Sequence, residues 1–284
     1  MPPVPSRRTY SLLIIGRAPD LQSIAATAIR GLTCEVDAVS TVDDGLVRLK
    51  ETPYDAILAE LDEQETVYLS CLHSIRKARP DSRLILIVDH STSNTVIQAI
   101  REDAFSYFSR PFDADLVVAM VRQALLVRGW EFDIELISAE PNYVTIKLRC
   151  ALDTADRLVQ FCREMPIDLS AEDKQEVADA FREMLLNAIE HGGKLNPEGW
   201  VTVARVRTQR TLVYYVQDPG DGFKRGELAH AATQNSVDPT AHIERRIDQG
   251  MRPGGFGILI TSHLVDEVIY NEAGNEVILI KHLD

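Results

Sequence analysis

Cysteines and aromatic residues are scarce in the sequence, and long apolar runs are absent. The four cysteines (Cys34, Cys71, Cys150 and Cys162) form no CxxC pair, so neither a disulfide framework nor a zinc site is expected. Aromatic residues make up 6% of the chain against 45% hydrophobic residues, which predicts aliphatic cores. Apolar runs such as 84–88 are too short to span a bilayer, and no signal-peptide core follows the N-terminus. We therefore expect a cytoplasmic protein without a membrane segment.

Positive charge is also in short supply. The sequence has 30 Lys and Arg residues against 43 Asp and Glu residues, a formal net charge of -13. A protein that binds DNA or RNA normally carries a basic face, so we expect no direct nucleic-acid partner. The length of 284 residues is sufficient for two domains, each with its own core.

From Tyr10 to about Arg128, short β-rich runs alternate with helical patterns. The expected strands are 10–15, 34–39, 56–59, 83–88 and 105–109, and the expected helices lie near 20–30, 42–51, 65–78, 93–102 and 114–127. This alternation predicts an α/β fold, a doubly wound (flavodoxin-like) parallel sheet of five strands with helices on both faces. We expect a flexible tail over residues 1–9, this domain over 10–128 and a linker over 129–131.

The pattern changes after Gly129. Two β-rich runs, 132–137 and 143–149, flank a turn-like sequence at 139–142 and predict a hairpin. Helices are expected at about 152–164, 172–190 and 257–266, and further strands at 201–207, 211–217, 267–270 and 276–283. Several antiparallel strands with helices on one face predict a two-layer α+β domain over residues 132–284.

The segment 172–193 combines a helical core stripe with two large polar side chains. The apolar residues that recur with helical spacing are Val177, Ala180, Phe181, Met184, Leu185 and Ala188. Glu183 and Asn187 are one turn apart, so they lie on the same side of the helix, beside that stripe. Gly192 and Gly193 follow as an expected helix C-cap.

Two glycine-containing motifs come later in the chain. Asp218 directly follows the predicted strand 211–217, where its carboxylate is able to accept a hydrogen bond from an exocyclic amine such as that of adenine. Gly220 and Gly222 allow the backbone to approach a flat base closely. The sequence Arg-Pro-Gly-Gly-Phe-Gly at 252–257 opens the next predicted helix, where backbone N–H groups and the helix dipole suit phosphate oxygens.

These motifs make residues of about 132–284 resemble the GHKL ATPases, which include gyrase, the heat-shock chaperone and histidine kinases. The resemblance implies ATP and Mg²⁺ as cofactors, with Asn187 as the metal ligand and Glu183 as the catalytic base. It also implies Asp218 as the adenine anchor. The glycines that it implies for nucleotide binding are Gly220, Gly222, Gly254, Gly255 and Gly257.

Within that superfamily, NAIEHG (187–192) and the closing sequence 256–281 look most like the bacterial anti-sigma-factor serine kinases. This resemblance implies phosphorylation of Ser or Thr on an anti-anti-sigma antagonist, sequestration of a sigma factor, and a homodimer. The second glycine box departs from the family pattern at Pro253, where the family usually has Gly. The alternative is a non-catalytic ATP-dependent binding or scaffold module. A histidine kinase fragment is disfavoured because no phosphoacceptor helix precedes the ATP domain.

Residues 10–128 resemble a response-regulator receiver domain, most clearly over 104–125. That family uses an acidic pair to hold Mg²⁺, an Asp to accept the phosphoryl group, a hydroxyl and a Lys. The corresponding positions here are Gly16 with Arg17, then Glu60, Val88 and Arg110. We therefore expect a pseudo-receiver that accepts no phosphate at Glu60 and serves in dimerisation or sensing. Glu60 either reaches Arg17 or Arg110 and fixes one state, or is a remaining carboxylate in a folded interaction domain.

Overall fold

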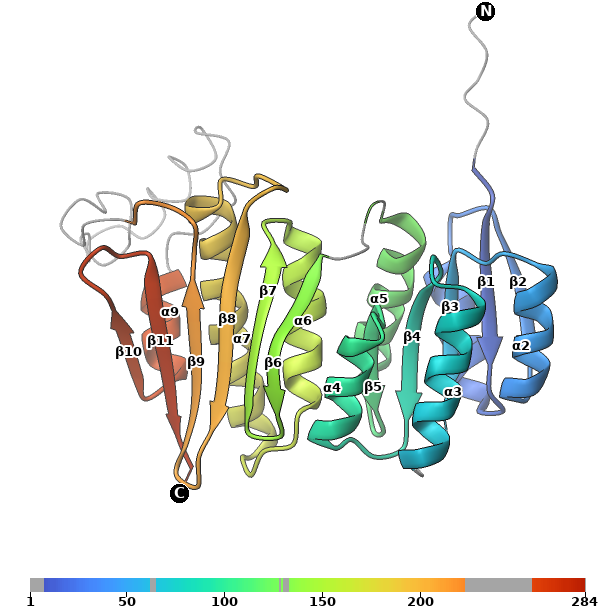
Figure 1. Cartoon of the computed structure of the whole chain (residues 1–284), viewed down its shortest axis with the longest axis horizontal. Coiled ribbons are helices and arrows are strands. Elements are labelled where there is room, and N and C mark those ends of the chain that lie inside the picture. Colours follow the sequence, from blue (N-terminus) through green and yellow to red (C-terminus); the bar gives the residue numbers. More distant parts are fainter. Residues whose placement is uncertain (1–7, 62–64, 128, 130–132, 223–256, 284) are drawn as a thin grey trace, which may run out of the picture. The chain divides into compact units, whose positions relative to one another are not determined.

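The computed structural model describes residues 8–61, 65–127, 129, 133–222 and 257–283 (Figure 1). The chain divides into two compact units. One comprises Met1–Phe132 with Glu164–Pro166, and the other comprises Asp133–Arg163 with Ile167–Asp284. Each unit is built on its own sheet.

The first unit contains a parallel five-stranded sheet with the order β2-β1-β3-β4-β5. Its strands are β1 (Tyr10–Ile15), β2 (Cys34–Val39), β3 (Ala56–Glu60), β4 (Arg83–Val88) and β5 (Ser106–Ser109). Strands β1, β3, β4 and β5 are buried along most of their length, as expected where helices cover both faces. The predicted doubly wound α/β fold is confirmed, and β5 begins one residue later than expected.

The described helices of the first unit are α1 (Pro19–Ala28), α2 (Val42–Glu51), α3 (Glu65–Ala78), α4 (Ser93–Arg101) and α5 (Ala114–Leu126). Side chains cap the N-termini of α2, α4 and α5, whereas α1 begins with Pro19 and has no side-chain cap. The Thr41 hydroxyl accepts a hydrogen bond from the Asp44 N–H at 3.1 Å, and Thr92 forms a capping box with Thr95. Helices α1 and α5 share one apolar cluster with strands β1, β3 and β4.

The second unit contains an antiparallel six-stranded sheet with the order β10-β11-β9-β8-β7-β6. Its strands are β6 (Ile134–Glu140), β7 (Tyr143–Arg149), β8 (Trp200–Arg207), β9 (Thr211–Gln217), β10 (Glu267–Tyr270) and β11 (Glu276–His282). Side chains along β8 and β9 alternate between buried and half-buried, which is typical of a sheet with one face on the core. The predicted hairpin is present, and its strands are joined by Pro141 and Asn142.

Helices α6 (Leu152–Glu164), α7 (Ala171–Asn187) and α9 (Gly257–Leu264) lie behind this sheet in Figure 1. Phe181 of α7 stacks on Tyr214 of β9 with 4.3 Å between the ring centroids, and both side chains are buried. The two-layer α+β architecture is confirmed. The helix predicted over 172–190 differs in one respect, because its α-helical part ends at Asn187 and a π-helical turn follows.

Candidate functional site

Helix α7 carries Glu183 and Asn187 in its last two turns. The helix is capped at its start by Ser170, whose hydroxyl accepts a hydrogen bond from the Asp173 N–H at 3.0 Å. Both Glu183 and Asn187 are half-buried, and their spacing of four residues places them on one side of the helix. The residues predicted as base and metal ligand therefore lie together, near the C-terminal end of α7.

The chain leaves α7 through a π-helical turn, Ala188–Gly192, in which the Gly193 N–H donates to the Ala188 carbonyl at 2.8 Å. Such turns are rare and frequently occur at functional sites. Gly193 has a φ of -81°, so it is not the left-handed cap that glycine usually provides at a helix end. A Cβ at Gly193 would lie 2.2 Å from the Cys150 Sγ. Close packing against Cys150, and not the backbone angle, excludes a side chain here.

Asp218 is half-buried one residue beyond the end of β9. Its N–H donates to the Asn275 carbonyl at 3.0 Å, and its Oδ1 accepts from the Gly220 N–H at 2.8 Å. The second bond makes an aspartate turn, which fixes the carboxylate relative to the backbone. Burial raises the pKa of Asp218, and the Gly220 N–H acts in the opposite direction. A fixed and partly desolvated carboxylate is suited to accepting a hydrogen bond from a ligand amine.

The aspartate turn and the end of α7 are in direct contact through glycines. A Cβ on Gly192 would lie 2.1 Å from the carboxyl carbon of Asp218. A Cβ on Gly220 would lie 2.9 Å from the Gly192 carbonyl oxygen. Neither position has room for a side chain, so the two segments approach as closely as their backbones allow. Two of the three predicted motifs therefore meet in space, and Gly192, which was not a predicted site residue, is where they meet.

The loop between β10 and β11 supports this junction and was not predicted to take part. The Asn271 Oδ1 accepts hydrogen bonds from the N–H groups of Gly274, Asn275 and Glu276 at 2.7, 3.1 and 3.2 Å. Asn275 Nδ2 in turn donates to the Gly220 carbonyl at 3.2 Å. Two asparagines flanking a glycine, as in Asn-Glu-Ala-Gly-Asn at 271–275, are a turn signal that could have indicated an ordered loop.

Gly222 ends the described part of the first glycine motif. Its φ is +79°, and a Cβ there would lie 2.0 Å from the Ala273 carbonyl oxygen. Both the backbone angle and the contact with the 271–276 loop therefore require glycine. The second glycine motif is less fully defined, because Gly254 and Gly255 lie outside the described residues. Gly257 is the first residue of α9, and α9 packs against α7.

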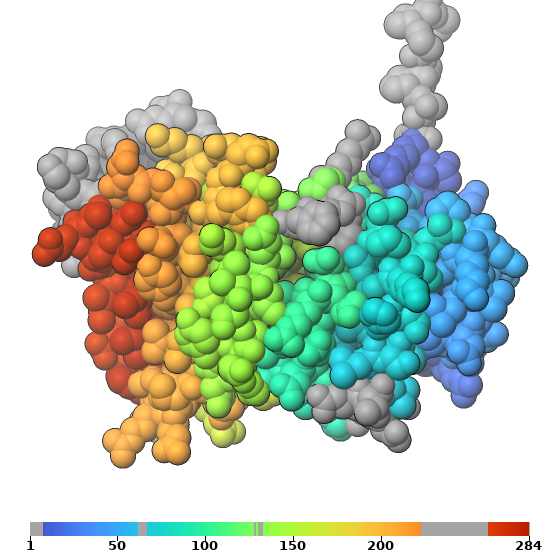
Figure 2. All heavy atoms as spheres, in the orientation of Figure 1, coloured from blue at the N-terminus to red at the C-terminus, as the bar shows by residue number. Residues whose placement is uncertain are grey.

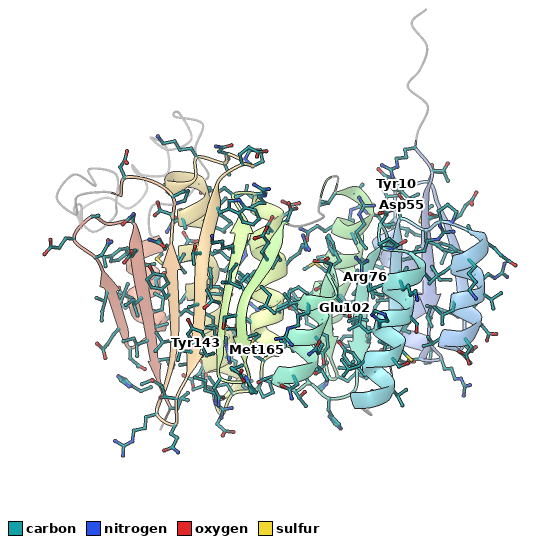
Figure 3. All side chains as sticks on the ribbon, viewed as in Figure 1. Tyr10, Asp55, Arg76, Glu102, Tyr143 and Met165 are labelled. Atoms are coloured by element: carbon teal, nitrogen blue, oxygen red, sulfur yellow. The ribbon has the colours of Figure 1, made fainter. Side chains whose placement is uncertain are left out.

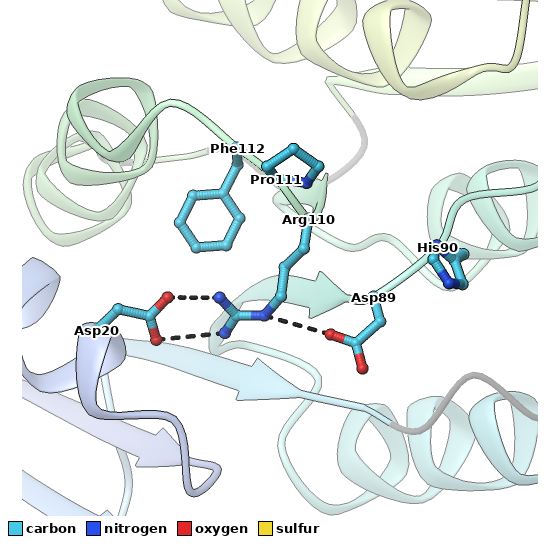
Figure 4. A pocket seen from close by; sticks show the side chains of 6 residues that line it. All are labelled: Asp20, Asp89, His90, Arg110, Pro111 and Phe112. Carbon is cyan, nitrogen blue, oxygen red and sulfur yellow. Dashed lines mark hydrogen bonds and ion pairs between the residues drawn. The ribbon is translucent and has the colours of Figure 1, made fainter.

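In the first unit, Arg110 is the centre of an ionic cluster that follows the strand ends. Its guanidinium donates to Asp20 and, at 3.1 Å, to Glu60, and its Nε lies 3.4 Å from Asp89. Figure 4 shows Asp20 and Asp89 on opposite sides of the guanidinium, in a pocket that Phe112 also lines. The hydrogen bond from Arg110 lowers the pKa of Asp20. Three carboxylates thus converge on one guanidinium, and neither Asp20 nor Asp89 was predicted to belong to the cluster.

Glu60, at the degenerate phosphoacceptor position, is held from two sides. Arg110 contacts its Oε1, and the backbone N–H groups of Arg17 and Ala18 donate to its Oε2 at 3.0 and 3.4 Å. Gly16 permits this approach, since a Cβ there would lie 2.8 Å from the Glu60 Cβ. Glu60 therefore meets the side chain of Arg110 but only the backbone of Arg17.

Family models match two parts of the chain. Residues 12–122 match the response regulator receiver domain, and residues 148–281 match the histidine kinase-like ATPase domain. The chain thus contains a receiver domain followed by a histidine kinase-like ATPase domain, and the second implies ATP binding. In the part of the chain that the structure describes, no helix has the length and apolar content to cross a membrane.

Curated relatives match over a limited stretch. A putative NtrX-like response regulator of Rickettsia bellii is 31% identical over 117 residues, which are 40% of this chain and 24% of that protein. The acid tolerance regulatory protein ActR of Rhizobium meliloti is 26% identical over 113 residues, 40% of this chain and 58% of the relative. A CheY-like receiver domain protein from Methanospirillum hungatei has 17% identity, covers 42% of this chain and 94% of its own, and has a TM-score of 0.36. The match to the Rickettsia protein therefore spans about a quarter of that relative's length.

Replacing Gly192 with alanine should weaken ATP binding, because the added methyl group would displace the Asp218 carboxylate. We expect the Kd of a fluorescent ATP analogue to rise about tenfold or more, which corresponds to about 1.4 kcal/mol. Lys50→Ala, at an exposed position in a helix of the first unit, is the control. Equal Kd values for the wild type and Gly192→Ala would contradict a role of this contact in binding.

Replacing Arg110 with alanine should destabilise the first unit by about 1 kcal/mol at pH 7, a modest value because the Arg110 side chain is 26% exposed. The pKa of Asp20 is lower in the folded protein than its ordinary value of 3.8, so its contribution is present above 3.8 and is lost as the pH falls through the folded value. Urea titrations should therefore show the difference between wild type and variant shrinking below about pH 4. Arg101→Ala, at an exposed arginine, is the control, and a difference that stays constant down to pH 2 would oppose this account.

Proposed function

We propose that this protein is an ATP-dependent signalling kinase that transfers a phosphoryl group to Ser or Thr of a partner protein, as the anti-sigma-factor kinases that it resembles do. The observation that carries the proposal is the contact between Gly192 and Asp218. Through this contact, the carboxylate suited to adenine is held against the helix that carries Glu183 and Asn187. In this proposal the receiver occupies residues 10–128 and the ATPase domain residues 132–284.

The residues at this junction fit an adenine nucleotide with its metal ion. Asp218 would accept a hydrogen bond from the adenine amine. Asn187 would offer its amide oxygen to Mg²⁺, which prefers oxygen ligands and commonly takes only one or two from the protein when phosphates supply others. Gly192 and Gly220 have no room for side chains, because Asp218 and the Gly192 carbonyl fill the space, so the two glycines bring the Asp218 carboxylate close to the end of α7.

Glu183 is the group that would act on the reacting hydroxyl. Mg·ATP, when bound, would supply the phosphoryl group and part of the neutralising charge. Glu183 would accept the proton of the partner's hydroxyl group as that oxygen takes the place of ADP on the γ-phosphorus. The half-buried position of Glu183 on a rigid helix favours this role, because the carboxylate is held in place yet accessible.

The first unit would serve as a docking and sensing domain that is not controlled by its own phosphorylation. The Glu60 carboxylate contacts Arg110 and two backbone N–H groups. A fixed negative charge would thus replace the one that a phosphoryl group adds reversibly. Tyr107 is fully buried with its hydroxyl 3.0 Å from the Thr95 Oγ1, which also favours a single conformation.

An anti-anti-sigma antagonist and a sigma factor are the proposed protein partners. The fixed Arg110 cluster also supports a second candidate, a non-catalytic module in which ATP only sets the conformation that a partner recognises. The two candidates differ in whether Glu183 participates in chemistry.

Substitutions at Glu183 and Asp218 should separate binding from transfer. Glu183→Gln should leave the Kd for ATP within about twofold of wild type but slow transfer by about 100-fold or more, since the proton acceptor is lost. Asp218→Ala should abolish binding by removing the adenine contact. Binding is measured by calorimetry, and transfer is measured with labelled ATP and a candidate antagonist domain, followed by detection of phosphoserine or phosphothreonine.

Glu172→Gln supplies the matched control for this experiment, because Glu172 is an exposed carboxylate in the first turn of the same helix. Undiminished transfer by Glu183→Gln would reject the base assignment. Unchanged affinity in Asp218→Ala would reject the adenine assignment.

Acetyl phosphate should not label the first unit. With Mg²⁺ and labelled acetyl phosphate, we expect no adduct on residues 10–128, because the acidic pair is replaced by Gly16 and Arg17 and the acceptor by Glu60. A receiver domain with the complete acidic set, treated in parallel, supplies the positive control. A Mg²⁺-dependent adduct mapped to this unit by mass spectrometry would refute the pseudo-receiver proposal.

A further inference from the structure

The loop between β10 and β11, residues 271–275, lies against the turn that carries Asp218. Figure 2 shows the red atoms of β10 and β11 directly beside the orange atoms of β9, the strand that Asp218 follows. The Asp218 N–H donates to the Asn275 carbonyl at 3.0 Å. The Asn275 side chain also donates, from its Nδ2 to the Gly220 carbonyl at 3.2 Å. One residue of the loop therefore holds the aspartate turn at both Asp218 and Gly220.

The orientation of the Asn271 amide is fixed by the backbone of this loop. Its Oδ1 accepts hydrogen bonds from three consecutive N–H groups, those of residues 274–276, at 2.7, 3.1 and 3.2 Å. The opposite orientation would place the Asn271 NH₂ group, which only donates, against these three donors. The Nδ2 therefore points away from them, and it donates to the Asn275 Oδ1 at 2.8 Å.

The orientation of the Asn275 amide follows from that of Asn271. Because its Oδ1 accepts from Asn271, its Nδ2 is the group that faces the Gly220 carbonyl. Gly220 is then held from both sides, since its own N–H donates to the Asp218 Oδ1 at 2.8 Å. A chain of hydrogen bonds thus connects Asn271 to the Asp218 carboxylate. Among the residues that the structure describes, none donates to the Asp218 Oδ2, which leaves that oxygen for a ligand amine.

We propose that Asn271 and Asn275 are positioning residues that give the candidate nucleotide site its preference for adenine. The inference rests on the proposed function, in which Asp218 accepts a hydrogen bond from the adenine amine. A carboxylate selects a base by direction as well as by charge, because a hydrogen bond weakens steeply when donor and acceptor are misaligned. The two asparagines fix that direction by acting through Gly220. A purine with a carbonyl oxygen in place of the amine would set an acceptor against the carboxylate and be rejected.

The ratio of the Kd for inosine triphosphate to the Kd for ATP measures this preference. Inosine triphosphate differs from ATP only in the base, where a carbonyl replaces the amine, and calorimetry on the full chain gives both Kd values. We expect the wild type to bind ATP about 100-fold more tightly. Asn275→Ala should lower the ratio about tenfold, because the Asp218 carboxylate loses its fixed direction. The Kd for ATP should rise, while the Kd for inosine triphosphate should stay within about twofold of wild type.

Asn271→Asp tests the chain of hydrogen bonds with an isosteric change. The new carboxylate still accepts from the three N–H groups of the loop but has no NH₂ group to donate to Asn275. The Asn275 amide would then turn its NH₂ group toward position 271, which sets its Oδ1 against the Gly220 carbonyl. We therefore expect the ratio to fall about tenfold in this variant as well.

Asn142→Asp makes the same change on the exposed turn between β6 and β7 and is the matched control. Tyr143, which is labelled in Figure 3, marks that end of the sheet, opposite the end where Asp218 follows β9. The control should keep the wild-type ratio. Equal rises in both Kd values of Asn275→Ala would indicate a purely structural role and overturn the inference, as would an unchanged ratio in Asn271→Asp. If circular dichroism shows that Asn275→Ala does not fold, Asn271→Asp decides the question alone.

Asp218→Ala in the same assay separates this inference from the proposed function. Loss of ATP binding in Asp218→Ala, together with wild-type ratios in both asparagine variants, would overturn the role of the asparagines and leave the adenine assignment intact. Unchanged ATP affinity in Asp218→Ala, or a wild type that binds neither nucleotide, would reject the adenine assignment and this inference with it.

Discussion

The close contact between Gly192 and Asp218 is the constraint on which the candidate nucleotide site depends. Strand β9 positions both partners of this contact. Its Tyr214 stacks on Phe181 of α7, and Asp218 directly follows its last residue. The stacking fixes where α7 crosses the sheet, and the glycine contact fixes how closely its end approaches the aspartate turn. The helix and the strand therefore form one rigid frame, in which the positions of Glu183 and Asn187 relative to Asp218 follow from core packing and require no mobile loop.

In the receiver unit, the permanent negative charge of Glu60 stands at the position where other receivers are phosphorylated reversibly. Arg110 has carboxylates on several sides, and the backbone N–H groups after β1 hold the far oxygen of Glu60. A phosphoryl group changes a receiver because it brings new charge that recruits donors. Here the donors, the Arg110 guanidinium and the backbone N–H groups of Arg17 and Ala18, already contact the Glu60 carboxylate. The negative charge that phosphorylation would add is therefore supplied by Glu60. A charge fixed in this way agrees with the proposed docking role, which does not depend on phosphorylation.

The sequence predicted much of this and missed the contacts that join distant segments. Hydrophobic periodicity located the strands and helices, and the position of Asp218 after an apolar strand was sufficient to place it at the sheet edge. The π-helical turn at Ala188–Gly192 was not predictable, because the α-helical pattern simply continues through it. The partnership of Arg110 with Asp20, and the support that Asn275 gives to Gly220, depend on tertiary packing that no local pattern encodes.

The position of Asp218 is also set by the residues beside it on β9 and β11. Gln217 and Glu276 are paired across these two strands and joined by a hydrogen bond of 3.0 Å. Gln217 directly precedes Asp218, and Glu276 directly follows Asn275, whose carbonyl accepts a hydrogen bond from the Asp218 N–H. The pairing of β9 with β11 therefore restrains both ends of the backbone contact that holds Asp218. The strand register thus positions the candidate nucleotide site as much as the glycine contact does.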